Sequence, residues 1–272
     1  MSDVVKRKAT ICVVNYKTLF LTMLCLRCIR KFTRYPYEVI VIDNDSRDES
    51  LNYLKSLTWI RLIERRNEPG MSGGSYTHGA SLDLGLQNCS TEFFVTLHSD
   101  AFVQKENWLS DLVSYFNDDE NTACVGSGKI EIKPKWETFL KNTFDMKKLE
   151  NRLFHGLEFA GRSRYYNRTI CCLYRTETLL KEKLSFLMGN NNGLTPGKKL
   201  YFELVDRGYR TLELSASLMA DYVFHLGHGT QVVHPEQFSI RRRTIRKGNR
   251  ALSKVKASRF FQSICADNSL DN

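Results

Sequence analysis

Two short apolar runs that stop abruptly at polar and charged residues place the strongest constraint on the fold of this chain. Residues 39–42 are followed by Asp43, and residues 93–97 are followed by His98 and Asp100. Short runs rich in β-branched and aromatic residues predict buried strands. In open α/β sheets, ligands bind outside the carboxyl ends of the strands. If the two strands are neighbours, Asp43, His98 and Asp100 face one crevice, where a metal ion and a diphosphate can meet.

The hydrophobic pattern alternates between strand and helix along the first hundred residues. It predicts strands at 10–15, 38–42, 59–64 and 92–97, and helices at 18–32, 48–56 and 77–87. After residue 100 the predicted elements are a helix at 106–117, a strand near 122–132, and apolar runs at 169–174, 198–207 and 210–214. This alternation indicates an α/β fold with a mostly parallel central sheet and flanking helices.

Composition indicates a soluble globular protein, since 42% of the 272 residues are hydrophobic and 26% are charged. The apolar stretch 11–29 raises the question of a membrane span, but Asn15, Lys17 and Arg27 interrupt it, so a strand followed by a helix is the better interpretation. Eight cysteines are scattered along the chain without a preceding secretory signal. We therefore expect reduced thiols in a cytoplasmic protein.

The pair Cys25 and Cys28 forms a C-x-x-C pattern, which is typical of redox and zinc sites. Both residues lie in a stretch with helical spacing, and no second cysteine pair stands at metal-site distance. We interpret them as half-buried helix cysteines.

Positive charge is concentrated near the end of the sequence. The chain carries a net charge of +10, and nine basic residues with no acid stand between Ile240 and Phe260, so the remainder is nearly neutral. Three interpretations of residues 241–259 remain open: contact with an anionic membrane surface, nucleic-acid binding, or a solvated tail.

Several motifs in the first 110 residues carry a family resemblance when they are taken in order. They are Asn15-Tyr16 after the first strand, Asp43-Asn-Asp-Ser46 after the second, Arg66-Asn67-Glu-Pro-Gly70 before a glycine-rich helix start, and a later strand ending in x-Ser-Asp. This order resembles the nucleotide-sugar glycosyltransferases of the family 2 type, which have the GT-A fold. The resemblance implies transfer of a sugar from a nucleotide-diphosphate sugar to a hydroxyl of a glycan or glycolipid.

The resemblance also implies roles for particular residues. Asp100 would bind a divalent cation, Mn²⁺ or Mg²⁺, that bridges the donor diphosphate, and His225 matches a histidine that supplies a further metal ligand. The residues expected to bind the nucleotide sugar are Asn15, Tyr16, Asp43, Asn67, His78 and His98. Because His98 stands where the family usually has the first aspartate, and imidazole suits Mn²⁺ better than Mg²⁺, the metal preference stays open. Asp100 also has a purely structural interpretation, as a turn or helix-capping acid.

One part of the family pattern is missing. The catalytic glutamate-aspartate pair falls on Pro196 and Gly197, whereas Glu203 and Asp206 are expected on a solvated helix face. Three explanations are compatible with this: another acid such as Glu158 or Asp145 accepts the proton, the enzyme retains anomeric configuration, or activity is lost.

The predicted organisation is a single GT-A-like catalytic domain over residues 1–240, followed by a basic extension over 241–272. Within the domain, residues 1–110 form the donor half and 111–240 the acceptor half. The expected location is the cytoplasm, with peripheral membrane contact through the basic segment. The alternatives are a nucleic-acid-binding protein, which we consider the weaker one, and an inactive relative that binds nucleotide sugars.

Overall fold

The computed structural model describes residues 8–66, 74–128, 130 and 166–272. Asn67, Asp145 and Glu158 lie outside these residues, so their predicted roles stay predictions.

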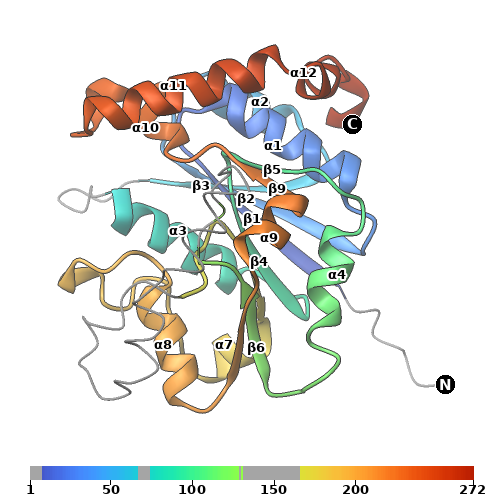
Figure 1. Ribbon diagram of the computed structural model, residues 1–272, viewed down its shortest axis with the longest axis vertical. Coiled ribbons are helices and arrows are strands. Elements are labelled where there is room, and N and C mark those ends of the chain that lie inside the picture. Colours follow the sequence, from blue (N-terminus) through green and yellow to red (C-terminus); the bar gives the residue numbers. More distant parts are fainter. Residues whose placement is uncertain (1–7, 67–73, 129, 131–165) are drawn as a thin grey trace.

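A seven-stranded sheet forms the centre of the protein (Figure 1). In spatial order its strands are β3 (Ile60–Arg65), β2 (Tyr37–Asn44), β1 (Ala9–Asn15), β4 (Phe93–His98), β7 (Cys171–Arg175), β6 (Thr122–Gly126) and β8 (Arg210–Glu213). The first four are mutually parallel, β7 is antiparallel to both neighbours, and β6 and β8 are parallel. The expected mostly parallel sheet is confirmed, with β7 as the reversed strand.

Two more strands form a small separate sheet. β5 (Ala101–Val103) follows β4 almost directly and pairs antiparallel with β9 (Val223–His225). This pairing returns the late part of the chain to the carboxyl end of β4.

Helices cover both faces of the central sheet (Figure 1). On one side lie α1 (Leu19–Phe32), α2 (Glu49–Ser56), α11 (Arg242–Ala257) and α12 (Arg259–Cys265), and on the other α3 (Gly74–Gln87), α7 (Thr176–Lys181) and α8 (Lys198–Asp206). The remaining helices of the described residues are α4 (Trp108–Ser114), α9 (Ala216–Tyr222) and α10 (Gly229–Val233), with 3₁₀ turns η1 (Asn190–Asn192), η2 (Pro235–Gln237) and η3 (Asn268–Asp271).

Strand periodicity divides the hydrophobic core into two layers. Val39 and Val41 of β2 belong to the cluster that packs against α1, whereas Ile40 and Ile42 belong to the cluster that packs against α3. Successive strand side chains point to opposite faces, so a strand covered on both sides must be apolar throughout. That requirement explains the uninterrupted run that the sequence shows there.

The two cysteines of the C-x-x-C pattern lie on the buried face of α1. Cys25 and Cys28 are both completely buried, so the expectation of half-buried side chains was wrong, although their place on a core helix is confirmed. Burial raises the pKa of both thiols well above its ordinary value. These cysteines therefore contribute to packing.

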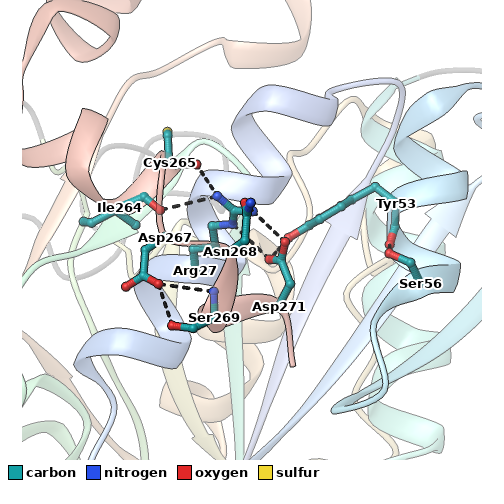
Figure 2. Close-up of polar contacts among 9 residues, drawn as sticks. All are labelled: Arg27, Tyr53, Ser56, Ile264, Cys265, Asp267, Asn268, Ser269 and Asp271. Atoms are coloured by element: carbon teal, nitrogen blue, oxygen red, sulfur yellow. Dashed lines mark hydrogen bonds and ion pairs between the residues drawn. The ribbon is translucent and has the colours of Figure 1, made fainter.

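The C-terminal segment is fastened to α1 through a buried arginine (Figure 2). Arg27 is 3% exposed, and its Nε and Nη2 donate to the two carboxylate oxygens of Asp271 at 2.9 and 2.5 Å. Its guanidinium also donates to Asn268 Oδ1 and to the carbonyl oxygen of Cys265, while Tyr53 donates to Asp271. A bidentate pair of this kind positions the segment after α12 against both α1 and α2.

Helix α11 is amphipathic. Gly248 and Val255 are buried, whereas the basic side chains of 241–259 are all exposed. Its inner face packs against α10, where a Cβ at Gly248 would lie 2.2 Å from Val232. Within the residues that the structure describes, no helix combines the length and the apolar character needed to cross a bilayer.

Candidate functional site

The carboxyl ends of β1, β2 and β4 meet at one edge of the sheet. In the strand register Asn15 lies opposite Asp43, and Val14 lies opposite His98. β2 and β4 are not neighbours in the sheet, because β1 lies between them, but all three strands end at the same edge, so Asp43, His98 and Asp100 follow strands that end there.

Asp43 is held by a closed hydrogen-bond network. Its Oδ1 accepts from Asn15 Nδ2 at 2.7 Å and from Ser46 Oγ at 2.6 Å, and its Oδ2 accepts from the Ser46 backbone N–H at 3.0 Å. Asn15 is completely buried, and its Oδ1 accepts from Thr22 at 2.7 Å. The amide of Asn15 is therefore used within the protein, and its visible effect is to orient Asp43.

Beside Asp43 lies a small polar hollow of about 410 Å³. It is lined by Asp43, Asp45, Arg47, Leu51, Glu64, Arg65 and Arg66. Arg47 donates to Asp45, and both residues have a positive φ, which reflects the tight turn between β2 and α2.

Three side chains converge at the end of β4. Asp100 Oδ1 lies 3.4 Å from His225 Nε2 and 3.7 Å from His98 Nδ1. One ligand atom from each residue lies within 4.8 Å of the others. Asp100 Oδ2 accepts from the Gly229 backbone N–H at 2.8 Å, which leaves Oδ1 facing the two imidazoles.

The antiparallel pairing of β5 and β9 brings His225 to this position. Ala101 lies opposite His225, and the Leu226 backbone N–H donates to the carbonyl oxygen of Asp100 at 2.9 Å. Gly229 must be a glycine here, because a Cβ would lie 2.6 Å from Asp100 Cβ and 2.8 Å from Leu21 Cδ1.

The electrostatics of the cluster favour an anionic Asp100 beside a neutral His98. Burial alone would raise the pKa of Asp100, but His225, His98 and the Gly229 N–H lower it well below its ordinary range. Burial lowers the pKa of His98 to about 3, and the neighbouring His78 lowers it further. The ring lies deep in the protein, and the 29% of the side chain that is exposed faces the cavity. Burial likewise lowers the pKa of His78 to about 4.

These residues fit a divalent cation. His225 Nε2 is buried and makes no hydrogen bond in the described structure, although it lies close to a carboxylate oxygen. A buried imidazole nitrogen without a hydrogen bond, next to an ionised carboxylate, is a suitable donor set for a metal ion. His98, Asp100 and His225 would hold the ion.

A cavity of about 730 Å³ opens over this cluster. Of the residues predicted from the sequence, Tyr16, His78, His98, Asp100 and His225 line it. Thr169 Oγ1 lies 3.4 Å from His98 Nε2 and 3.5 Å from His78 Nε2, so one hydroxyl joins two of these histidines.

Some cavity residues were not singled out from the sequence. Tyr166, Arg168 and Thr169 precede β7, in a stretch where the sequence pattern did not indicate a binding site. His228 also lines the cavity, with a positive φ and its Nδ1 2.8 Å from Gln231 Oε1. Strained backbone of this kind concentrates at functional sites.

Comparison with solved structures supports the fold assignment. The mannosyltransferase PcManGT from Pyrobaculum calidifontis, solved in complex with GDP-Man and Mn²⁺, matches with a TM-score of 0.53 and 14% identity, over 98% of this chain and 80% of that one. S. aureus TarS 1-349 matches with a TM-score of 0.51 and 14% identity, over 93% of this chain and 73% of that one. At these identities the likeness shows the fold alone, and the predicted GT-A fold is confirmed.

Sequence comparison identifies the family. The O-antigen chain rhamnosyltransferase WbaN of Salmonella anatum is 30% identical over 97 residues, which is 35% of this chain and 28% of that relative. The matched part is thus under a third of the relative's length. The model of the family described as glycosyl transferase family 2 matches residues 10–181, which is more than half of the sequence. This chain therefore belongs to glycosyl transferase family 2, as the order of its motifs predicts.

Proposed function

We propose that this protein transfers a hexosyl or related sugar from a nucleotide-diphosphate sugar to a hydroxyl of a glycan or lipid-linked acceptor. The observation that carries the proposal is the cluster of His98, Asp100 and His225 at the sheet edge that also holds Asp43. Members of the family transfer sugars, and PcManGT was solved with GDP-Man and Mn²⁺. The relationship to WbaN favours an acceptor in polysaccharide biosynthesis.

The donor would lie along the sheet edge. Asp43, fixed by Asn15 and Ser46, would contact the nucleoside beside the 410 Å³ hollow, with Tyr16 at the cavity wall. Asn67 is proposed for the same nucleotide from its motif alone. His78 and His98 would contact the diphosphate or the sugar from the cavity wall.

The proposed cofactor is Mn²⁺ or Mg²⁺, held by His98, Asp100 and His225. When bound, such an ion neutralises the negative charge that develops on the departing nucleoside diphosphate. Two nitrogen ligands and one carboxylate favour Mn²⁺ over Mg²⁺, which prefers oxygen. The protein's own part is to hold Asp100 ionised through His225, His98 and the Gly229 N–H.

The three explanations for the missing catalytic acids remain open. Pro196 lines the cavity where the family has an acid, and Asp100 is the single carboxylate among the described residues that line it. This arrangement is compatible with each of them: Glu158 or Asp145 acts as the base, the reaction retains anomeric configuration, or activity is lost.

We also propose that residues 241–259 hold the protein at the surface of an anionic membrane. All nine basic side chains are exposed, and no carboxylate of the described residues lies within ion-pair distance of any of them. Phe260, 42% exposed, continues this surface. Each basic residue near such lipids contributes about 1 kcal/mol. A cytoplasmic location with peripheral contact fits this picture, and nucleic acid is the alternative ligand.

Calorimetric titration with UDP and GDP, with and without Mn²⁺ or Mg²⁺, tests the donor site. We expect one nucleotide to bind in a metal-dependent manner and Asp100→Ala to abolish that dependence. Asp221→Ala, at an exposed position on α9, is the control and should bind like the wild type. Unchanged metal-dependent binding by Asp100→Ala would contradict the assignment.

A further inference from the structure

Two positively charged side chains lie close to one aromatic ring on the wall of the main cavity. Arg168 Cζ lies 5.5 Å and Lys198 Nζ lies 6.0 Å from the ring centroid of Tyr166. The ring is held in place because Tyr166 Oη lies 2.5 Å from Thr195 Oγ1. The Arg168 backbone N–H donates to the carbonyl oxygen of Ser127 at 3.0 Å, which fixes the chain next to the ring.

Neither cation has an acidic partner within residues 8–66, 74–128, 130 and 166–272. Arg168 Nε is buried and makes no hydrogen bond with any described residue. Burial lowers the pKa of Lys198, and the positive charge of Arg168 lowers it further. Two neighbouring like charges, one with a buried unsatisfied donor, are unfavourable unless an anion lies between them.

Arg168 lines the main cavity, and Lys198 lies near it at the start of α8. Tyr166, Arg168, Thr195 and Pro196 line the same cavity as Asp100. Lys198 begins α8, and Figure 1 places α8 and α10 on opposite sides of the sheet. Lys198 therefore lies on the α8 side, whereas Asp100 is capped by the start of α10.

We propose that Arg168 and Lys198 form an anion subsite that binds a phosphate-class group carried by the acceptor. The proposal rests on the proposed function, because it assigns the metal cluster to the donor diphosphate and this pair to the other substrate. A guanidinium can bind two phosphate oxygens at once while stacking on Tyr166, and an ammonium supplies a second charge. The acceptor would thus carry an anionic group near its reactive hydroxyl.

The donor's own diphosphate offers the same chemistry, so the experiment must separate the two sources. Methyl phosphate is titrated calorimetrically into the full chain in EDTA, and then into protein saturated with Mn²⁺ and the nucleotide that binds. The variants are Arg168→Gln, Lys198→Gln and the control Lys199→Gln, whose side chain already pairs with Glu203 at 4.0 Å. Circular dichroism melts verify that each variant is folded.

We expect Arg168→Gln and Lys198→Gln each to weaken methyl phosphate binding at least tenfold, with Lys199→Gln unchanged. Nucleotide affinity should stay the same in all three, and methyl phosphate should still bind the nucleotide-saturated wild type. If the nucleotide displaces methyl phosphate and the two variants lose both ligands equally, the pair serves the donor and the proposal is overturned. Absence of methyl phosphate binding by the wild type would overturn it as well.

Failure of the proposed function has a different signature. If neither UDP nor GDP binds with any metal, while methyl phosphate binding depends on Arg168, the donor assignment fails and the anion subsite is supported.

Discussion

The buried pair between Arg27 and Asp271 offers a sharp test of how the C-terminal segment is held (Figure 2). Asp271→Ala removes both carboxylate oxygens that accept from the guanidinium and also the acceptor of the Tyr53 hydroxyl. Arg27, 3% exposed, keeps three neutral acceptors among the described residues: Asn268 Oδ1 and the carbonyl oxygens of Ile264 and Cys265. The variant therefore leaves a buried charge without its counter-charge.

The expected loss of stability follows from that uncompensated charge. Removing one partner of a buried ion pair costs about 3 to 5 kcal/mol. The Asp271 side chain is 21% exposed, so water reaches the pair, and we expect about 3 kcal/mol, the lower end of that range. With an unfolding entropy of about 2 cal/mol/K per residue, this corresponds to a decrease in Tm of about 5 °C.

Differential scanning calorimetry and urea unfolding measure the effect. Asp267→Ala is the matched control, because the Asp267 side chain accepts only from Ser269 among the described residues; as the N-cap of η3 it should cost about 1 kcal/mol, well below the loss caused by Asp271→Ala. In the double variant with Arg27→Met, the loss caused by Asp271→Ala should largely disappear, since no charge is left unpaired. The reasoning is refuted if Asp271→Ala and Asp267→Ala melt at the same temperature.

Three further predictions concern pH, the metal cluster and the basic helix. Burial would raise the pKa of Asp271, but hydrogen bonds from Arg27 and Tyr53 lower it below its ordinary value. The stability that ionised Asp271 contributes is therefore present above the unfolded pKa of about 3.9 and is lost as the pH falls through the folded pKa. The urea midpoints of wild type and Asp271→Ala should converge as the solution is acidified, and a constant difference would contradict this. Gly229→Ala places a Cβ 2.6 Å from Asp100 Cβ and should displace Asp100. Loss of a contact that supports a metal ligand typically weakens metal binding about 10- to 100-fold, and we expect that decrease in Mn²⁺ affinity in a calorimetric titration. Wild-type affinity would show that Asp100 is not displaced. Replacing Arg246 and Lys247 by glutamine should weaken sedimentation with anionic vesicles about 30-fold, from about 1 kcal/mol per residue, whereas Lys181→Gln/Lys183→Gln should not. Equal effects of the two pairs, or binding of RNA in preference to vesicles, would argue against the membrane surface.

Local pattern was sufficient to predict the elements of the first hundred residues. The apolar runs that became β1, β2 and β4 are buried on both faces, so their strand character and, to within two residues, their ends at Asn15, Asn44 and His98 appear directly in the residue pattern. The order of these motifs also predicted the family and the position of Asp100. Helix α11 was evident as a basic segment, because its charges are contiguous in sequence.

Tertiary structure alone decided how distant residues meet. His225 lies beside Asp100 because β9 pairs with β5, a contact between segments more than a hundred residues apart that no local pattern encodes. The absence of a Cβ at Gly229 is required by Asp100 and Leu21, which belong to other elements. The cation–π contacts of Arg168 and Lys198 with Tyr166 likewise form because the segment before β7, which carries Tyr166 and Arg168, lies next to the start of α8, which carries Lys198. Sequence determines which backbone each segment prefers, whereas the charge, burial and unpaired atoms of a site depend on neighbours that only the folded chain supplies.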